Sequence, residues 1–199
     1  MSPLTPTTRR RPSGPPAASA RPSPGGVGRG SSATAERVSD ALRRLDHDDL
    51  TARRRVTALG LVATAALGVV QAYQTGLIRR PPEPGGVPYL DAEKVDAAGE
   101  AYVLLRTPDS ALGMASYGAT LALVGMGPED RATSMPVVPL LAAAKVVGDA
   151  VSSSYLFLEQ ITKHRAVCSW CTAAAVANVA AVPLVLPEAR RAWRALRGR

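Results

Sequence analysis

Residues 56–78 read VTALGLVATAALGVVQAYQTGLI, and these 23 residues include no formally charged side chain. At about 1.5 Å per residue, a helix of this length crosses the roughly 30 Å hydrocarbon core of a bilayer. A cleaved signal peptide is the alternative, but its apolar region is usually about 7–15 residues long. The length therefore favours a retained transmembrane helix.

Three further apolar segments follow this one. Residues 110–127 and 166–186 are uncharged, and residues 135–158 carry charge only at Lys145 and Asp149. Because a membrane interior has no water to hydrogen-bond the backbone, such segments fold as helices. The sequence predicts an all-α membrane protein, a four-transmembrane-helix bundle with a disordered N-terminal tail.

The flanking segments differ in composition from the spans. Pro, Gly, Ser and Arg dominate residues 1–32, which predicts a disordered cytoplasmic tail. A weak apolar stripe among charges predicts an amphipathic juxtamembrane helix over residues 33–55. Residues 56–186 are then the transmembrane domain, and residues 187–199 a basic cytoplasmic tail.

The basic residues predict the orientation. The region through Arg55 has 11 Arg and five acids, the tail from Pro187 has five Arg and one Glu, and residues 79–109 have a net charge of −2. Cytoplasmic flanks carry the excess of Arg and Lys, so we expect a multi-pass protein of the inner or plasma membrane with both termini cytoplasmic. The net charge of +8 then reflects topology and contact with membrane lipid, and no nucleic-acid partner is expected.

The only two cysteines form the motif Cys168-Ser169-Trp170-Cys171 at the extracytoplasmic start of the last span. This spacing puts both sulfurs on one helix face, where they can form a disulfide, and a helix N-terminus stabilises a thiolate. Two cysteines packed as small apolar side chains are the alternative. No metal site is expected, because His47 falls on the opposite side of the membrane.

The segment HRAVCSWCTAAAVANVAAVPLVL, residues 164–186, together with LGMASYG, residues 112–118, resembles the vitamin K epoxide reductase family. The resemblance covers roughly residues 56–186. It implies a four-helix thiol–disulfide oxidoreductase that uses a quinone of the ubiquinone or menaquinone type. It also implies that Cys171 faces the quinone and that Cys168 exchanges disulfides with a donor.

One departure from the family pattern concerns the first outer loop. Active members usually carry a second cysteine pair there, whereas residues 79–109 contain none. Either a partner engages Cys168 directly, or a thioredoxin-like extracytoplasmic protein supplies the shuttle. The alternative function is a non-enzymatic bundle that binds a quinone or a partner protein.

Three further residues are candidates for the quinone pocket, each with a structural alternative. Tyr117 is the best-placed aromatic side chain because it lies deep in the second span. Trp170 either stacks on the quinone or belongs to the aromatic belt at the membrane surface. Asn178 either donates a hydrogen bond to a quinone carbonyl or bonds between helices. Lys145 and Asp149 are either functional or a neutralising pair on one helix face.

Overall fold

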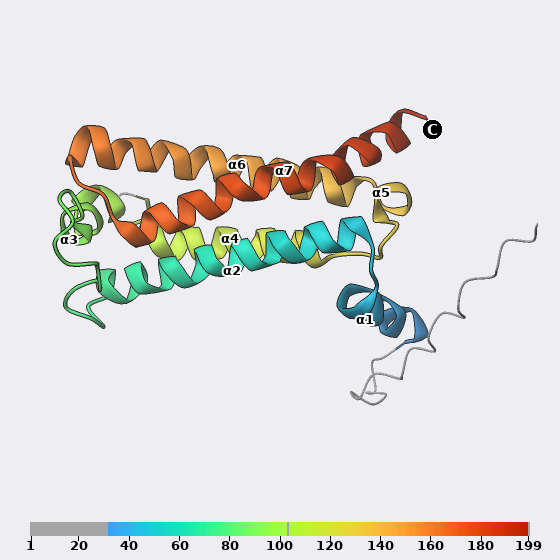
Figure 1. Ribbon diagram of the computed structural model, residues 1–199, viewed down its shortest axis with the longest axis horizontal. Helices are drawn as coiled ribbons and strands as arrows, with labels where there is room; N and C mark the ends of the chain where they lie inside the picture. Colours follow the sequence, from blue (N-terminus) through green and yellow to red (C-terminus); the bar gives the residue numbers. More distant parts are fainter. Residues whose placement is uncertain (1–31, 103, 199) are drawn as a thin grey trace, which may run out of the picture.

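Helices make up the fold of the described residues, 32–102 and 104–198 of the computed structural model, with no strand among them (Figure 1). Among these residues, Leu90 and Val167 form an isolated parallel β-bridge. In order, the elements are α1 (Ala33–Arg44), α2 (Asp48–Gln74), α3 (Ala92–Asp96), η1 (Gly99–Tyr102), α4 (Asp109–Gly125), α5 (Arg131–Ser134), α6 (Val137–Glu159), η2 (Gln160–His164) and α7 (Ser169–Arg197).

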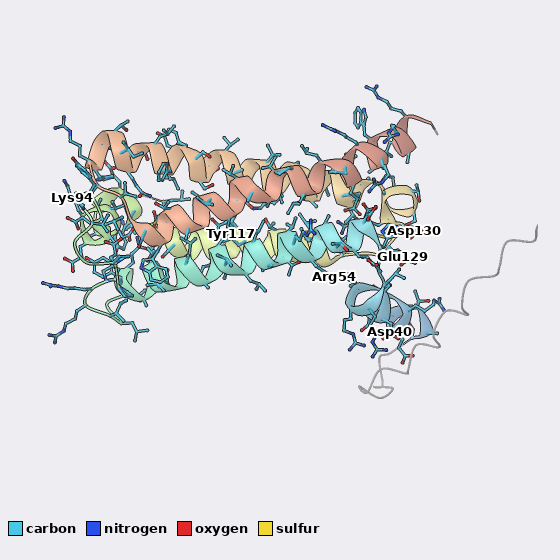
Figure 2. The ribbon with its side chains drawn as sticks, viewed as in Figure 1. Asp40, Arg54, Lys94, Tyr117, Glu129 and Asp130 are labelled. Carbon is cyan, nitrogen blue, oxygen red and sulfur yellow. The ribbon has the colours of Figure 1, made fainter. Side chains whose placement is uncertain are left out.

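Four long helices, α2, α4, α6 and α7, lie side by side as an elongated bundle (Figure 1). Helix α7 packs along both α2 and α6, and α4 packs along α2. Helix α1 and the C-terminus lie at one end, called the α1 end below, and α3 lies at the other, called the α3 end. Figure 2 shows Lys94 at the α3 end and Asp130 at the α1 end.

Among the described residues, three helices are long and apolar enough to cross a membrane: Asp48–Gln74, the continuous segment Val137–His164, and Ser169–Arg197. Helix α4 has 17 residues, which corresponds to about 26 Å. Apolar side chains on the outer surface of the bundle are exposed, among them Leu61, Val151 and Val176. A bundle with such an outer surface fits contact with lipid rather than water.

Small residues line the interior contacts of the bundle. The central cluster contains Ala63, Ala66, Ala174 and Ala177 packed against Tyr117. Helices that pack in a membrane use small residues at their contacts, because these let two backbones approach closely. The chain therefore buries an alanine-rich seam between α2 and α7.

One close approach joins α2 and α4. A Cβ atom added at Gly113 would lie 2.4 Å from Cδ1 of Leu67, and one at Gly60 would lie 2.9 Å from Cδ2 of Leu121. Carbon atoms that are not bonded to each other do not approach so closely, so a larger residue fits at either glycine only if the leucine side chain shifts. Both glycines therefore serve packing within this chain.

Some helices begin or end at other residues than the sequence predicts. The helix expected over residues 33–55 is divided, since α1 ends at Arg44 and α2 begins at Asp48. The break arises because His47 adopts an extended backbone and its side chain accepts a hydrogen bond from the Asp49 N–H, 3.2 Å away, which caps a new helix. Apart from Ser32, which caps α1, the tail expected over residues 1–32 lies outside the described residues.

The last helix continues past residue 186, where the span was expected to end. Helix α7 includes both Pro183 and Pro187 and runs on to Arg197. The Arg-rich segment expected as a separate tail is thus mostly the last turns of α7. Hydrogen bonds from Arg53 and Arg131 to Glu188 keep this extension of α7 attached to the bundle.

A buried cluster of charges ties the α1 end together. The Glu188 carboxylate accepts hydrogen bonds from Arg53 of α2 at 2.5 Å and from Arg131 of α5 at 2.9 Å. The remaining guanidinium N–H groups of both arginines donate to backbone carbonyls that follow α4, which include those of Met126 and Pro128. Since all three charged groups are buried, this network fixes α2, α5 and α7 relative to one another.

Candidate active site

The two cysteines lie where α7 begins. Cys168 is the N-cap residue of α7, and its Sγ accepts a hydrogen bond from the Cys171 N–H at 3.3 Å. Both thiols are free, and their sulfur atoms lie within 4.8 Å of each other. The first helical turn thus holds both sulfurs at the positive end of the helix dipole.

Glu83 fixes the start of α7 from the first outer loop. Its Oε1 accepts from the Ser169 N–H at 2.9 Å, and its Oε2 accepts from the Ala92 N–H at 2.7 Å. The first N–H groups of a helix have no partner within the helix, so a carboxylate stabilises them. One side chain therefore caps α3 and α7 together.

Three more hydrogen bonds hold the segment before α7. The Cys168 N–H donates to Oε1 of Gln160 at 2.9 Å. The Val167 N–H donates to the Tyr89 carbonyl at 2.7 Å, and the Asp91 N–H donates to the Val167 carbonyl at 3.1 Å. The outer loop therefore lies directly over Cys168, whose exposed fraction is 0%.

Asp96, the last residue of α3, lies against the thiols. Its Oδ1 accepts from the Cys171 Sγ–H at 3.4 Å, and its Oδ2 has no hydrogen-bond partner among the described residues. The side chain is buried, and loss of hydration raises the pKa of this carboxyl to about 6. The three side chains of Asp96, Cys168 and Cys171 are called the thiol–carboxyl cluster below.

Sequence analysis did not identify Asp96 as a site residue. The only local signal is its spacing, four residues after Ala92 and next to Val95, both of which are buried. That spacing would have put Asp96 on the apolar face of the short helix. Nothing else in the sequence distinguishes Asp96 from the other acidic residues of the loop.

The thiol–carboxyl cluster has the ligand types that zinc accepts. One atom from each of Asp96, Cys168 and Cys171 lies within 4.8 Å of the others. A structural zinc site uses four protein ligands, whereas these residues offer three. The absence of a metal site thus stays a prediction from the sequence.

A cavity of about 250 Å³ extends from the thiol–carboxyl cluster into the bundle. Asp96 and Cys171 line its α3 end, Tyr117 and Asp149 line its inner part, and Leu67 is among the apolar residues of its wall. Figure 2 shows Tyr117 within the bundle, well away from both ends. The cavity therefore connects the Cys171 thiol with a buried aromatic hydroxyl.

The predicted pocket residues divide into two groups. Cys171 and Tyr117 line the cavity, and Asn178 lies behind it, where its Nδ2 donates to the Tyr117 hydroxyl at 2.7 Å. Trp170 does not line the cavity either. Its Nε1–H donates to the Pro82 carbonyl at 2.8 Å, so its ring holds the outer loop against α7.

A polar cluster forms the inner wall of the cavity. Lys145 pairs with Asp149 at 2.5 Å, which is one of the two alternatives that their spacing left open. The Asp149 carboxylate also accepts from the hydroxyls of Ser116 at 2.9 Å and Thr120 at 2.6 Å, both on α4. The charge of Asp149 is thus neutralised and hydrogen-bonded while the side chain still faces the cavity.

The helices, the thiols and the cavity together define the class of protein. The chain is a multi-pass helical membrane protein with a pair of free thiols beside an internal cavity. A model of the vitamin K epoxide reductase family matches residues 55–186, two thirds of the chain, and the chain therefore belongs to that family. A search of curated proteins gave no match. The family match supports a membrane function of the thiol–disulfide and quinone oxidoreductase kind.

Proposed function

We propose that this protein is a membrane thiol–disulfide oxidoreductase that couples Cys168 and Cys171 to a quinone of the ubiquinone or menaquinone type. One observation carries the proposal: Cys171 lines the internal cavity while its sulfur lies within 4.8 Å of that of Cys168. In the forward direction both thiols are oxidised to one disulfide, and two electrons and two protons reduce the quinone to a quinol. The reverse direction reduces a quinone-derived substrate at the expense of a thiol donor.

The cavity has the size and chemistry that a quinone ring requires. Its volume of about 250 Å³ is close to the lower limit of the roughly 300–1,000 Å³ typical of small-molecule sites. Its wall combines apolar side chains such as Leu67 and Val70 with the hydroxyl of Tyr117. A flat apolar ring with polar oxygens needs this combination, and its isoprenoid tail would extend between helices toward lipid.

Tyr117 is the side chain that we assign to a quinone carbonyl. Because Asn178 donates to the Tyr117 oxygen, the phenolic proton remains available to donate elsewhere. The acceptor of that proton would be a carbonyl oxygen of the bound ring. Asn178 then acts as the residue that orients Tyr117, and Trp170 as the residue that anchors the loop.

The proposed topology has four membrane crossings with both termini in the cytoplasm. The N-terminal helix α1 and the C-terminus lie at the same end of the bundle (Figure 1), as an even number of crossings requires. Helix α1 and the last turns of α7, which both carry arginines, lie at that end. The thiol–carboxyl cluster then faces the extracytoplasmic side, where a thioredoxin-like protein is the proposed exchange partner and disulfides persist.

The test is turnover in a lipid nanodisc with a dithiol and a short-chain ubiquinone or menaquinone analogue. Wild type should reduce the quinone catalytically, and both Cys168→Ala and Cys171→Ala should lose this activity. Ser169→Ala, which changes a residue between the two cysteines, is the matched control and should retain it. Full activity in either cysteine variant would contradict the proposal.

A second candidate function follows from the absence of cysteines in residues 79–109. Without a shuttle pair, and with Cys168 covered by the outer loop, a bundle that binds a quinone or partner without turnover is the alternative. This alternative predicts that alkylation of both thiols leaves the cellular role intact. The oxidoreductase function predicts that alkylation abolishes it.

A further inference from the structure

We propose that Asp96 is a catalytic residue of this protein, namely the group that accepts the proton of the Cys171 thiol when the dithiol is oxidised and returns it in the reverse direction. This inference rests on the proposed thiol–quinone function and assigns to it a residue outside the C-x-x-C motif. It addresses a chemical requirement of the site, since two thiols cannot become a disulfide unless both protons leave.

The position of Asp96 meets the geometric requirement for such a group. Its Oδ1 lies 3.4 Å from the Cys171 Sγ, which is hydrogen-bond distance for a thiol donor. Both Asp96 and Cys171 line the cavity, so a proton on the carboxyl is at the edge of the space proposed for the quinone. A general base must first be within reach of the proton that it removes.

The surrounding structure holds the Asp96 carboxyl in place. Ala92 and Val95 of the same helix are buried against Val70 and Ala166, and the Asp96 carbonyl accepts from Nε2 of Gln74 at 3.1 Å. Cys171 provides the hydrogen bond to Oδ1, whereas Oδ2 has none among the described residues. A buried carboxyl oxygen without a partner costs free energy, which indicates a group kept for chemistry rather than for stability.

The electrostatic surroundings make Asp96 a stronger base than an exposed aspartate. The titratable groups that act on it or share its cavity wall are Tyr73 of α2, Glu83 of the loop before α3, Glu100 of η1, Asp109 and Tyr117 of α4, Asp149 and Glu159 of α6, His164 of η2, and Cys168 and Cys171 of α7. Burial is the largest effect and raises the pKa of Asp96 to about 6 against the opposing effect of the Cys168 and Cys171 thiols, and repulsion from Asp109 and Glu83 adds to the rise. A base whose pKa lies near the working pH is ionised yet still binds a proton well.

The proposed step balances as follows. The Asp96 carboxylate accepts the proton of the Cys171 S–H bond as the electron pair of that sulfur becomes available to the quinone. Cys168 then forms the S–S bond with Cys171 and releases its own proton. Two electrons have passed from the sulfurs to the quinone, and the quinol oxygens receive the Cys168 proton and the proton held on Asp96.

The experiment compares wild type, Asp96→Asn and the control Asp91→Asn in nanodiscs, over a range of pH. Asp91 caps α3 through the Lys94 N–H, and asparagine caps as well as aspartate, so this control changes a loop carboxylate without changing the helix. Two reactions are followed: oxidation of the pre-reduced protein by a short-chain ubiquinone analogue, and alkylation of Cys171 by monobromobimane, which needs no quinone. Thermal unfolding establishes that each variant is folded.

We expect Asp96→Asn to slow oxidation by the quinone about 100-fold at neutral pH, and to abolish the rise in both rates around pH 6, where Asp96 ionises. Asp91→Asn should match wild type. If wild type reduces the quinone but Asp96→Asn keeps its rate and pH profile, the role of Asp96 is wrong and the oxidoreductase function stands. If wild type does not reduce the quinone, the oxidoreductase function fails, and the alkylation profile alone decides for or against Asp96 as a base.

A measurement on wild type keeps the inference testable if Asp96→Asn does not fold. The time-resolved infrared difference spectrum, recorded while a quinone oxidises the dithiol form, should contain a transient carboxylic acid C=O band that shifts in D₂O. The band reports the proton that Asp96 holds before it passes to the quinol. A spectrum without any change in the carboxyl region would overturn the proposal.

Discussion

Asp96 is buried against two thiols, although an isolated carboxylate is among the most costly groups to remove from water. The sequence predicts Cys168 and Cys171 as a pair because their relation is local, three residues apart at a helix start. It does not predict the contact of Asp96 with Cys171, because these residues are far apart in the chain and meet only after the loop docks on α7. Local patterns thus identify the thiols, and tertiary contacts supply the carboxyl.

The burial of Asp96 predicts a specific dependence of stability on pH. Its pKa is raised from 3.8 to about 6, so the folded state binds the proton more tightly than the unfolded state does. Stability is therefore highest below about pH 4 for this group and falls as the pH rises through about 6. Relative to wild type, Asp96→Asn should gain about 2–3 kcal/mol in free energy of unfolding between pH 4 and pH 8.

Denaturant unfolding of the reduced protein in one detergent at both pH values measures this difference. Asp91→Asn serves as the control and should follow wild type. A stability difference between Asp96→Asn and wild type that does not change with pH would show that the Asp96 carboxyl titrates like an exposed one.

The hydrogen bond between Tyr117 and Asn178 predicts strong coupling between these two residues. Either Tyr117→Phe or Asn178→Leu leaves a buried polar group without its partner, which costs about 1–3 kcal/mol. The double variant should cost less than the sum, because no unpaired group remains. A double-mutant cycle on thermal or denaturant unfolding checks this, and additive effects would argue against the 2.7 Å bond.

At the scale of elements, the first outer loop is the part of the fold that sequence reasoning describes least well. The helical spacing of its apolar residues is visible in the sequence, and the structure forms α3 and η1 there. The way in which the loop docks depends on Glu83 bonding to the Ser169 N–H and on the bridge between Leu90 and Val167. No local pattern encodes contacts between segments so far apart.

The double cap formed by Glu83 predicts that this side chain controls access to Cys168. In a Cys171→Ala background, Glu83→Ala removes the partner of two helix N-termini, which costs about 1 kcal/mol for each cap. Local opening of the loop should become more frequent, about tenfold for each 1.4 kcal/mol. The rate at which a small maleimide alkylates Cys168 should rise accordingly.

Glu93→Gln is the control for this measurement, because the pair that Glu93 makes with Arg80 is exposed and is worth little. Equal alkylation rates for Glu83→Ala and Glu93→Gln would mean that Glu83 does not hold the loop over Cys168.

At the scale of the whole molecule, the helical bundle follows from the sequence because long uncharged segments have few alternatives in a membrane. The helix ends at the α1 end do not follow, since they depend on contacts between distant residues. The cap at His47 starts α2 early, and the buried pairs of Glu188 with Arg53 and Arg131 keep the end of α7 within the fold. Charge counting assigned Arg53 and Glu188 to flanks, did not include Arg131 between the second and third spans, and could not show that the three residues meet.

The buried charge cluster predicts a large loss of stability when the Glu188 carboxylate is neutralised. Glu188→Gln leaves two buried guanidinium groups without a counter-charge, which should lower the free energy of unfolding by about 3–5 kcal/mol. Glu93→Gln, the same chemical change at an exposed pair, should lower it by less than about 1 kcal/mol. Unfolding in mixed micelles measures both, and equal losses would contradict a structural role for the cluster.

The most direct test of the proposed function is a single turnover without oxygen. Pre-reduced protein in nanodiscs is mixed with an equimolar short-chain quinone, remaining thiols are trapped by alkylation, and the products are identified by mass spectrometry. We predict one quinol for each disulfide formed, with the disulfide joining Cys168 to Cys171. Formation of quinol while both cysteines remain alkylatable, or no quinol at all from fully reduced and folded protein, would contradict the thiol–quinone function.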